Sequence, residues 1–437
     1  MDCSAKLSLQ ALAIKSRQSS PLNPGPDSQT ASTGADELSA PGGRLPVLDG
    51  IRGLAILLVM LHHFTKGYVL EDWIGKFLLR LTESAWCGVD LFFVLSGFLI
   101  TGILFDAKES RSYFRSFYMR RILRIFPLYY GVLALMFLVV PLFKSFSPSM
   151  QLAAQQQGWL WAFGTNIAMA VQGSWIYHAD WLNLGHFWTL AVEEHFYLIW
   201  PAVVLLLGRE ALMKTCVGCA VAALALRVVL TATSANYILI EVLTPCRMDA
   251  LAIGAFVALA ARGPGGLTAL TRPSRWLAAT SAVLLGLLFI GRGSLSDEDF
   301  LVQTIGFTFL DLFFAAILVL VVTSPKSLLG RFFSHPALRF LGVFSYAIYV
   351  LHLPLQPVCN KLIWLSGKTA FFYSGFAGAV SYVLLASTVS ILAGVLSWHC
   401  FEKHFLRLKK FFTYAPTQRG IRSPWIRILL FAKRSAH

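Results

Sequence analysis

Charged side chains are scarce in this chain of 437 residues: 14% are Asp, Glu, Lys or Arg, whereas 56% are hydrophobic. An ordinary soluble domain has about 25% charged residues, and a soluble fold of this length needs more polar side chains to cover its surface. The shortage therefore excludes the soluble classes, including soluble nucleic-acid-binding proteins. The net charge of +15 is instead explained by basic cytoplasmic loops, which are common in membrane proteins.

Cysteines are too few and too widely spaced for a disulfide framework, since only seven occur in 437 residues. Cys216 and Cys219 form a CxxC motif, but it lies in an apolar segment without a second pair of ligands. Small core residues therefore explain it better than redox or zinc chemistry does. No His, Cys or Asp cluster has the spacing of metal ligands, so we predict no metal site and no bound cofactor.

Aromatic residues are missing from residues 1–44, which are rich in Ser, Pro, Gly and Ala. A segment of this composition cannot bury enough apolar surface to order itself, and its apolar run near Leu12 is too short for a signal peptide. We predict a disordered N-terminal tail over 1–44, a membrane domain over 45–402 and a basic cytoplasmic tail over 403–437. That last tail mixes basic with aromatic residues, which favours a position along the anionic cytoplasmic leaflet, with a solvated tail as the alternative.

Long apolar runs are abundant, and many approach the roughly 20 residues that cross a bilayer. They predict an all-α polytopic membrane protein with about ten transmembrane helices. The expected spans are 48–66, 85–105, 126–144, 187–207, 212–231, 237–261, 276–291, 302–323, 338–357 and 375–400. An eleventh run, 158–172, is short and broken by Gly164 and Asn166, and we expect it to be re-entrant or to lie at the outer surface.

The distribution of Lys and Arg orients these spans, because cytoplasmic loops carry an excess of positive residues. With ten spans and a cytoplasmic N-terminus, 23 of the 37 basic residues lie in cytoplasmic loops and the C-terminal tail, and seven lie outside. An eleventh span would instead put the basic C-terminal tail on the outside. We therefore expect both termini to be cytoplasmic.

Ionisable residues inside a span are costly and are therefore functional candidates. In the first span, Arg52 and His63 are eleven residues apart, which is close to three helical turns, so they share one face about 16 Å apart along the axis. This spacing suits a long ligand whose charged end contacts Arg52 and whose reactive end reaches His63. His63 could also be a core histidine, and for the neighbouring His62 that interpretation is favoured.

Asp90 lies at the start of the second span, which enters from the outer side, so its depth could match that of His63. There it could hold the imidazole in one tautomer and stabilise its protonated form. The alternative is a structural ion pair with an arginine such as Arg227 or Arg247. Arg247 could also pair with Asp249, two residues further on.

Arg121 and Arg124 lie one helical turn apart, just before the third span. Such a pair at the cytoplasmic interface could bind phosphate groups. Arginines that flank a span are also common as topology anchors and lipid contacts. On its own the pair slightly favours that second interpretation.

Two adjacent carboxylates, Glu193 and Glu194, lie at the outer end of the fourth span with His186 and His195. Both carboxylates would not stay unpaired in an apolar environment, so at most one should face a cavity. Helical periodicity puts the two on different sides of the helix, and we predict that Glu193 matters more.

Together these strings resemble the membrane-bound acyltransferase-3 family of bacterial O-acyltransferases. The resemblance spans essentially all of 45–406, with the motifs in family order. The motifs that carry it are LDGIRGLAILLVMLHHF (48–64), GVDLFFVLSGFLI (88–100), FYMRRILRIFPLYY (117–130), GHFWTLAVEEHFYLIWP (185–201), CRMDALAIG (246–254), FSYAIYVLH (344–352) and SWHCFEKHFL (397–406). One such motif would be a weak signal, whereas seven in sequence are specific.

The resemblance implies a bacterial inner-membrane enzyme that transfers an acyl group, with acetyl expected, from cytoplasmic acyl-CoA to a hydroxyl, often on a sugar of a surface glycan or glycolipid. The family's Arg-x10-His pattern falls on Arg52 and His63, and its Arg-x-x-Arg pattern falls on Arg121 and Arg124. The family's Glu-Glu-Gln is Glu-Glu-His at 193–195 here, so the third position departs from the pattern.

The residues and the resemblance together predict two groups of site residues. An acceptor hydroxyl is a poor nucleophile at neutral pH, so a histidine is expected to act as its general base, while acylation of that histidine is the less favoured route. The predicted catalytic residues are His63, Asp90 and Glu193. The predicted acyl-CoA-binding residues are Arg52, Arg121 and Arg124.

Some family members have a C-terminal esterase-like domain, whereas only about 35 residues follow the last span here. We therefore expect the membrane unit to act alone on acyl-CoA and a hydroxyl-bearing acceptor, with the lipid bilayer as its other partner. A transporter or flippase for lipid-linked or acylated substrates is the alternative, since the intramembrane charges alone suit either class. A weaker alternative keeps the enzyme but gives it a small cytoplasmic acceptor.

Overall fold

The computed structural model describes most of the chain that follows the predicted N-terminal tail. The described residues are 45–143, 147–179 and 181–414. Most of them are helical, and the strands among them form one antiparallel hairpin of β1 (His178–Ala179) and β2 (Leu182–Asn183). The predicted all-α class is therefore confirmed. The predicted tail over 1–44 and residues 415–437 lie outside the described residues.

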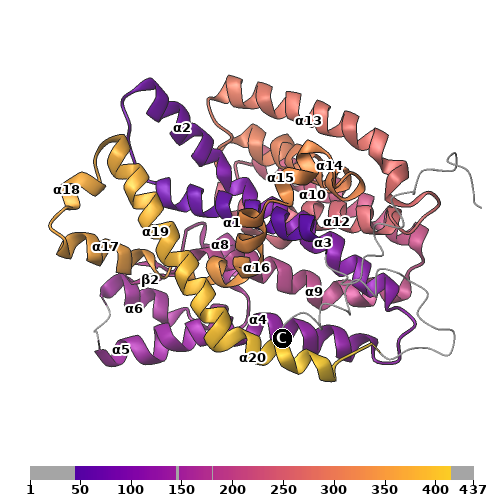
Figure 1. Cartoon of the computed structure of the whole chain (residues 1–437), viewed down its shortest axis with the longest axis horizontal. Coiled ribbons are helices and arrows are strands. Elements are labelled where there is room, and N and C mark those ends of the chain that lie inside the picture. The colour runs from indigo at the N-terminus through magenta and orange to yellow at the C-terminus, as the bar shows by residue number, and fades with distance from the viewer. Residues whose placement is uncertain (1–44, 144–146, 180, 415–437) are drawn as a thin grey trace, which may run out of the picture. The chain divides into compact units, whose positions relative to one another are not determined.

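Long helices form most of the described chain and are drawn in Figure 1. They are α1 (Pro46–Thr65), α3 (Gly88–Asp106), α4 (Tyr113–Ala134), α9 (Trp188–Leu206), α10 (Arg209–Ala232), α12 (Thr244–Ala260), α13 (Thr271–Arg292), α14 (Phe307–Thr323), α16 (Pro336–Leu351) and α19 (Gly375–Ser397).

Shorter helices connect or extend the long ones. They are α2 (Trp73–Glu83), α5 (Val140–Phe143), α6 (Pro148–Gln155), α7 (Gly158–Trp161), α8 (Thr165–Gln172), α11 (Tyr237–Val242), α15 (Leu328–Phe333), α17 (Gln356–Leu365), α18 (Thr369–Phe372) and α20 (Lys403–Arg407). The remaining 3₁₀ and π turns are Ser84–Cys87, Leu135–Val139, Gly185–Phe187, Gly266–Leu270, Val302–Gly306, Trp398–Glu402 and Leu408–Phe411.

The membrane spans agree with the prediction of about ten. Within the described ranges, nine helical segments are long and apolar enough to cross a bilayer, and α16 with α17, bent by 79°, makes a tenth. The run 158–172 instead forms α7 and α8, which are too short to span. The third span begins earlier than predicted: α4 begins at Tyr113, so Arg121 and Arg124 lie within this helix rather than before it.

The helix α1 packs closely against α16 and also contacts α3. A Cβ atom at Gly53 would overlap the carbonyl oxygen of Leu338, and one at Gly342 would overlap the carbonyl oxygen of Asp49. Only glycine at these two positions lets the backbones touch, as in other small-residue contacts between membrane helices. The contact therefore holds α1 in a fixed register along α16.

The bundle has two ends, which we name after residues of α1. At the end where α1 stops, the His63 end, α2, α17 and α18 lie together on the left of Figure 1, and the Tyr68 hydroxyl donates a hydrogen bond of 2.6 Å to the Phe372 carbonyl. The opposite end, where α1 begins, is the Arg52 end. The two predicted groups of α1 therefore belong to different ends of the bundle.

The segment after α19 turns back onto α4 rather than leaving the protein. Arg120 of α4 donates a hydrogen bond of 3.2 Å to the Phe412 carbonyl, and Tyr414 is buried. Burial raises the pKa of Tyr414 to about 12. Residues 412–414 of this tail therefore contact α4, while its expected position along the leaflet stays a prediction. The remainder of that tail is outside the described part of the chain.

Candidate active site

The helix α1 carries Arg52 and His63 as one uninterrupted element from Pro46 to Thr65. Eleven residues of α-helix place the two side chains about 16 Å apart on one face. Arg52 lies 3.4 Å from Asp49, one turn earlier, and its side chain is 35% exposed. The Arg52 side chain therefore keeps accessible surface beside this carboxylate.

The hydrogen bond of His63 defines which ring nitrogen is available. Its Nδ1 lies 2.9 Å from the carbonyl oxygen of Val59. A carbonyl oxygen only accepts, so Nδ1 carries the proton and Nε2 is the accepting nitrogen of the neutral ring. The imidazole keeps some accessible surface. This tautomer suits a general base that acts through Nε2.

Two further histidines, which the sequence did not connect with His63, lie beside it. The His63 and His352 ring centroids are 5.0 Å apart, and those of His352 and His186 are 4.8 Å apart. His352 donates from Nδ1 to the Tyr349 carbonyl at 2.7 Å. Among the described residues, its buried Nε2 and both ring nitrogens of His186 have no hydrogen-bond partner. Unpaired buried nitrogens are costly, so this histidine cluster (His63, His186 and His352) has capacity for polar groups of a ligand or water.

His62 is directed to a neighbouring helix, as the core-histidine interpretation expects. Its Nδ1 lies 3.1 Å from the carbonyl oxygen of Glu83, the last residue of α2. The same argument as for His63 makes this nitrogen a donor. His62 therefore fastens α1 to α2 at the His63 end.

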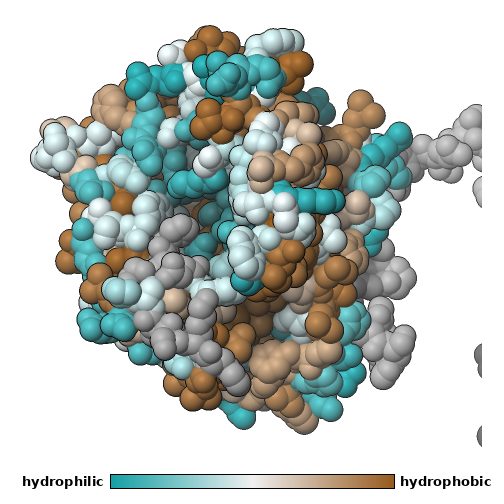
Figure 2. All heavy atoms as spheres, turned by 90° about the vertical axis from the view of Figure 1, so that its left-hand side faces the viewer, coloured by the Kyte–Doolittle hydropathy of each residue, from teal (hydrophilic) through white to brown (hydrophobic). Residues whose placement is uncertain are grey.

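The surface of the protein at the His63 end has a polar depression. Figure 2 looks onto this end and shows a hollow lined by hydrophilic residues. His62 and His63 lie in the last turn of α1, which stops at this end. A polar acceptor could therefore approach the bundle from this side.

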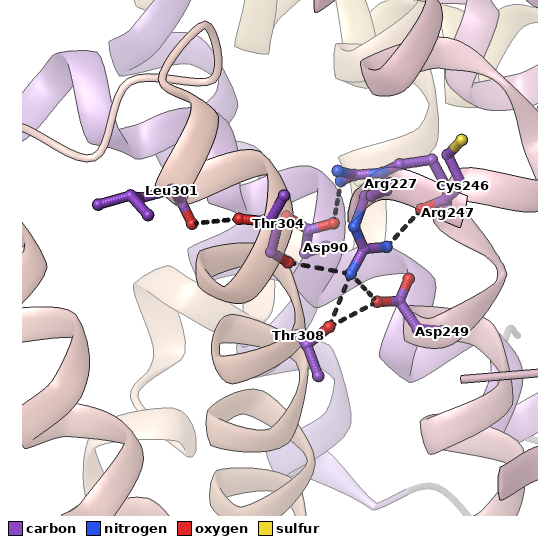
Figure 3. A network of polar contacts seen from close by, with 8 residues as sticks. All are labelled: Asp90, Arg227, Cys246, Arg247, Asp249, Leu301, Thr304 and Thr308. Carbon is purple, nitrogen blue, oxygen red and sulfur yellow. Dashed lines mark hydrogen bonds and ion pairs between the residues drawn. The ribbon is translucent and has the colours of Figure 1, made fainter. Parts of the chain in front are cut away.

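Asp90 belongs to a different cluster of charges, shown in Figure 3. It forms a buried ion pair with Arg247, and within the described ranges no contact joins Asp90 to His63. Beside this pair, Arg227 donates to Asp249 at 2.6 Å and to Thr308 at 2.6 Å. The structure thus supports the ion-pair interpretation of Asp90, and its predicted orienting role has no contact to support it.

Glu193 is brought together with the arginines of the Arg52 end, so the prediction that it lies at the opposite, outer end from them is corrected. It lies beside Ser96 and Tyr197, whose hydroxyl groups are hydrogen-bonded at 2.6 Å, and it interacts electrostatically with Arg121 and Arg52. Four helices, α1, α3, α4 and α9, therefore contribute to one polar site. Arg52, Arg121 and Glu193 are more than 60 positions apart in the sequence, which could not show that they meet.

The two residues that follow Glu193 in the sequence, Glu194 and His195, make different contacts from it. Glu194 also interacts with Arg121, but its buried Oε1 lacks a hydrogen-bond partner among the described residues. His195 points to α12, since its Nδ1 lies 2.8 Å from Thr244 Oγ1. His195, the position that departs from the family pattern, therefore contacts the start of α12.

Arg121 and Arg124 point inward against aromatic rings instead of outward along α4. The Arg121 guanidinium lies 5.8 Å from the Tyr197 ring centroid, and that of Arg124 lies 5.4 Å from the centroid of Tyr346. Arg124 is also 3.9 Å from Glu402 and 25% exposed. Half-buried, inward-facing guanidinium groups are better placed for a ligand than for lipid headgroups.

Comparison with known proteins connects this geometry to a family. The family model described as an acyltransferase domain matches residues 45–398. YrhL of Bacillus subtilis (strain 168), named a candidate peptidoglycan O-acetyltransferase, is 28% identical over 404 residues, covering 82% of this chain and 54% of its own. No solved structure matches the chain significantly.

Two further relatives carry similar names. OatA of Listeria monocytogenes serovar 1/2a (strain ATCC BAA-679 / EGD-e), named a peptidoglycan O-acetyltransferase, is 26% identical over 349 residues, covering 73% of this chain and 50% of its own. OatA of Staphylococcus aureus (strain NCTC 8325 / PS 47), named an O-acetyltransferase, is 25% identical over 398 residues, covering 86% of this chain and 60% of its own. The chain thus spans about half the length of the curated relatives it matches. Because the family model matches most of the chain, the chain belongs to the acyltransferase-3 family.

Proposed function

We propose that this protein is an integral membrane O-acyltransferase of the bacterial inner (plasma) membrane. It moves an acyl group, with acetyl expected, from cytoplasmic acyl-CoA to a hydroxyl of a carbohydrate-containing acceptor. The observation that carries the proposal is α1, which presents Arg52 and His63 on one face about 16 Å apart, with Arg121 beside Glu193 at one end and a polar hollow at the other. The names of the relatives support acetyl as the group and peptidoglycan as one class of acceptor.

The Arg52 end is proposed to face the cytoplasm and to bind the donor. Arg52, Arg121 and Arg124 each offer a planar fork of donors to phosphate oxygens. The flexible arm of CoA would then run along α1 towards His63. Glu193, which interacts with Arg121 and Arg52, holds these guanidinium groups towards the donor.

The chemical step is proposed to occur at His63. Its Nε2 takes the proton of the acceptor hydroxyl while the oxygen attacks the thioester carbonyl. The tetrahedral adduct then breaks its C–S bond, the ester remains on the acceptor, and CoA leaves as thiolate that takes the proton from the imidazolium. The unpaired nitrogens of His186 and His352 are available to bind the acceptor or water close to this step.

The direct test is to give radiolabelled acetyl-CoA to the full chain in nanodiscs, with soluble peptidoglycan fragments as acceptor. We expect label on the acceptor, or hydrolysis when the acceptor is withheld. Neither product, together with movement of a labelled lipid-linked sugar across a liposome membrane without acetyl-CoA, would establish the transporter or flippase alternative. Transfer to a small acceptor from the Arg52 side alone would establish the cytoplasmic-acceptor alternative.

A further inference from the structure

The chain beyond the family-matched region covers the arginines of α4. The match ends at residue 398. After that point, Ser116 Oγ donates a hydrogen bond of 3.0 Å to the Thr413 carbonyl, and Arg120 donates one of 3.2 Å to the Phe412 carbonyl. Side chains of α4 therefore hold the returning backbone in place.

This returning segment brings Lys409 among three guanidinium groups. Lys409 interacts electrostatically with Arg120, Arg121 and Arg124, and its carboxylate neighbour is Glu402. Glu402 is already 3.9 Å from Arg124. As far as the structure describes the chain, the Lys409 ammonium has no hydrogen bond or ion pair of its own. We name Arg120, Arg121, Arg124 and Lys409 the cation cluster.

The charge of the cation cluster is not balanced at Lys409. All four side chains are half-buried, so water screens their mutual repulsion less than at an open surface. Glu193 and Glu194 interact with Arg121, but Lys409 is not among their charged neighbours. An anion with several phosphate oxygens would relieve the repulsion, with the arginines as forked donors and the lysine as a compact point charge.

We propose that Lys409 is a further phosphate contact of the donor site, completed by a segment that lies outside the family-matched region. The ligand chemistry is a phosphate ester, and the expected source is a phosphate group of acyl-CoA. An anionic phospholipid offers the same chemistry and is the competing source. The inference rests on the proposed function, because it adds a contact to the proposed donor.

The test is calorimetric titration of CoA and of 3′-dephospho-CoA into the full chain in nanodiscs of neutral phosphatidylcholine. Lys409→Gln should weaken CoA binding about tenfold, as expected for one charge-assisted hydrogen bond, while Lys409→Arg should keep most of the affinity. Lys410→Gln is the matched control, because Lys410 is exposed and lies against the Phe411 ring at 4.9 Å. With acetyl-CoA as substrate, Lys409→Gln should raise KM and leave kcat unchanged.

The outcomes separate this inference from the proposed function. If Arg121→Ala weakens CoA binding and Lys409→Gln does not, Lys409 is not a donor contact and the proposed function stands. If neither variant changes CoA binding, the proposed donor end is wrong altogether. An unchanged CoA affinity, combined with loss of the phosphatidylglycerol that co-purifies with the detergent-solubilised wild-type protein, would assign Lys409 to the lipid and overturn the proposal. An equal loss of CoA and 3′-dephospho-CoA affinity would place Lys409 on the diphosphate, and a loss for CoA alone would place it on the 3′-phosphate.

Discussion

Two arginine-rich clusters of this bundle differ in how their charge is balanced. In the buried cluster, Arg227 and Arg247 each contact a carboxylate and are essentially inaccessible, with exposures of 0% and 2%. In the cation cluster, the half-buried guanidinium groups of Arg121 and Arg124 face aromatic rings and Lys409, and Arg124 lies a longer 3.9 Å from Glu402. An arginine within a membrane helix therefore does not by itself mark a binding site, since a paired one stabilises the fold.

The largest expected effect belongs to neither cluster and tests whether chemistry is separate from donor binding. His63→Ala removes the proposed general base, so transfer should fall about 10²- to 10⁴-fold. CoA affinity should stay near that of the wild type, because the cation cluster is at the other end of α1. The measurement is transfer from radiolabelled acetyl-CoA, with titration of CoA alongside. His62→Ala is the matched control, and near-normal transfer by folded His63→Ala protein would refute the mechanism.

The next effect tests the structural assignment of the buried cluster. Arg247→Gln leaves the Asp90 carboxylate buried without its cation, which should lower the free energy of unfolding by about 3–5 kcal/mol. The loss would be seen as a lower thermal unfolding midpoint in detergent. The CoA affinity of the remaining folded protein should be unchanged. A stable Asp90→Asn variant that has lost transfer would instead revive Asp90 as the residue that orients His63.

A smaller effect tests the cation cluster. Arg121→Ala should weaken CoA binding about tenfold to a hundredfold, the range expected for hydrogen bonds to a charged group. Arg121→Lys should recover little of this, because the planar fork is lost. Arg111 is exposed and serves as the control arginine. Equal affinities in Arg121→Ala, Arg111→Ala and wild-type protein would reduce Arg121 to a topology anchor.

The smallest effect distinguishes the two adjacent carboxylates. Glu193→Gln should reduce transfer about fivefold. It removes the carboxylate charge, whose interaction with Arg121 and Arg52 is worth roughly 1 kcal/mol. Glu194→Gln should change transfer less, since Glu194 interacts with Arg121 but not with Arg52. Both variants need matched expression and insertion. A larger loss in Glu194→Gln would reverse the assignment, and normal activity in both would remove carboxylates from the proposed site.

Much of the fold could be predicted because each span is a local property of the sequence. Runs of apolar residues located ten segments, and the 3.6-residue period placed Arg52 and His63 on one face. The start of α4 was missed by 13 residues, from 126 to Tyr113, because arginines in its first turns lower the local hydropathy. The helix accommodates an arginine such as Arg121 because its guanidinium points inward onto an aromatic ring, that of Tyr197.

The contacts across the site could not be predicted, because they depend on how distant helices pack. His352 lies nearly 290 residues after His63, and only the contact of α16 with α1 brings their rings together. The sequence offered Asp90 three partners, His63, Arg227 and Arg247, and the packing of α3 on α12 favours Arg247. The return of Lys409 to α4 had no signal in the sequence, since a basic stretch is equally typical of a solvated tail.

The glycine contact between α1 and α16 has a consequence for the choice of donor. Because the two backbones touch at Gly53 and Gly342, α1 cannot slide along α16 without a clash. In the proposed mechanism, the distance of about 16 Å between Arg52 and His63 would then act as a molecular ruler. A compact donor such as acetyl phosphate, whose phosphate is bonded directly to the acetyl group, could occupy one end of the ruler but not both. Reach, rather than the reactivity of the acyl group, would therefore select the donor.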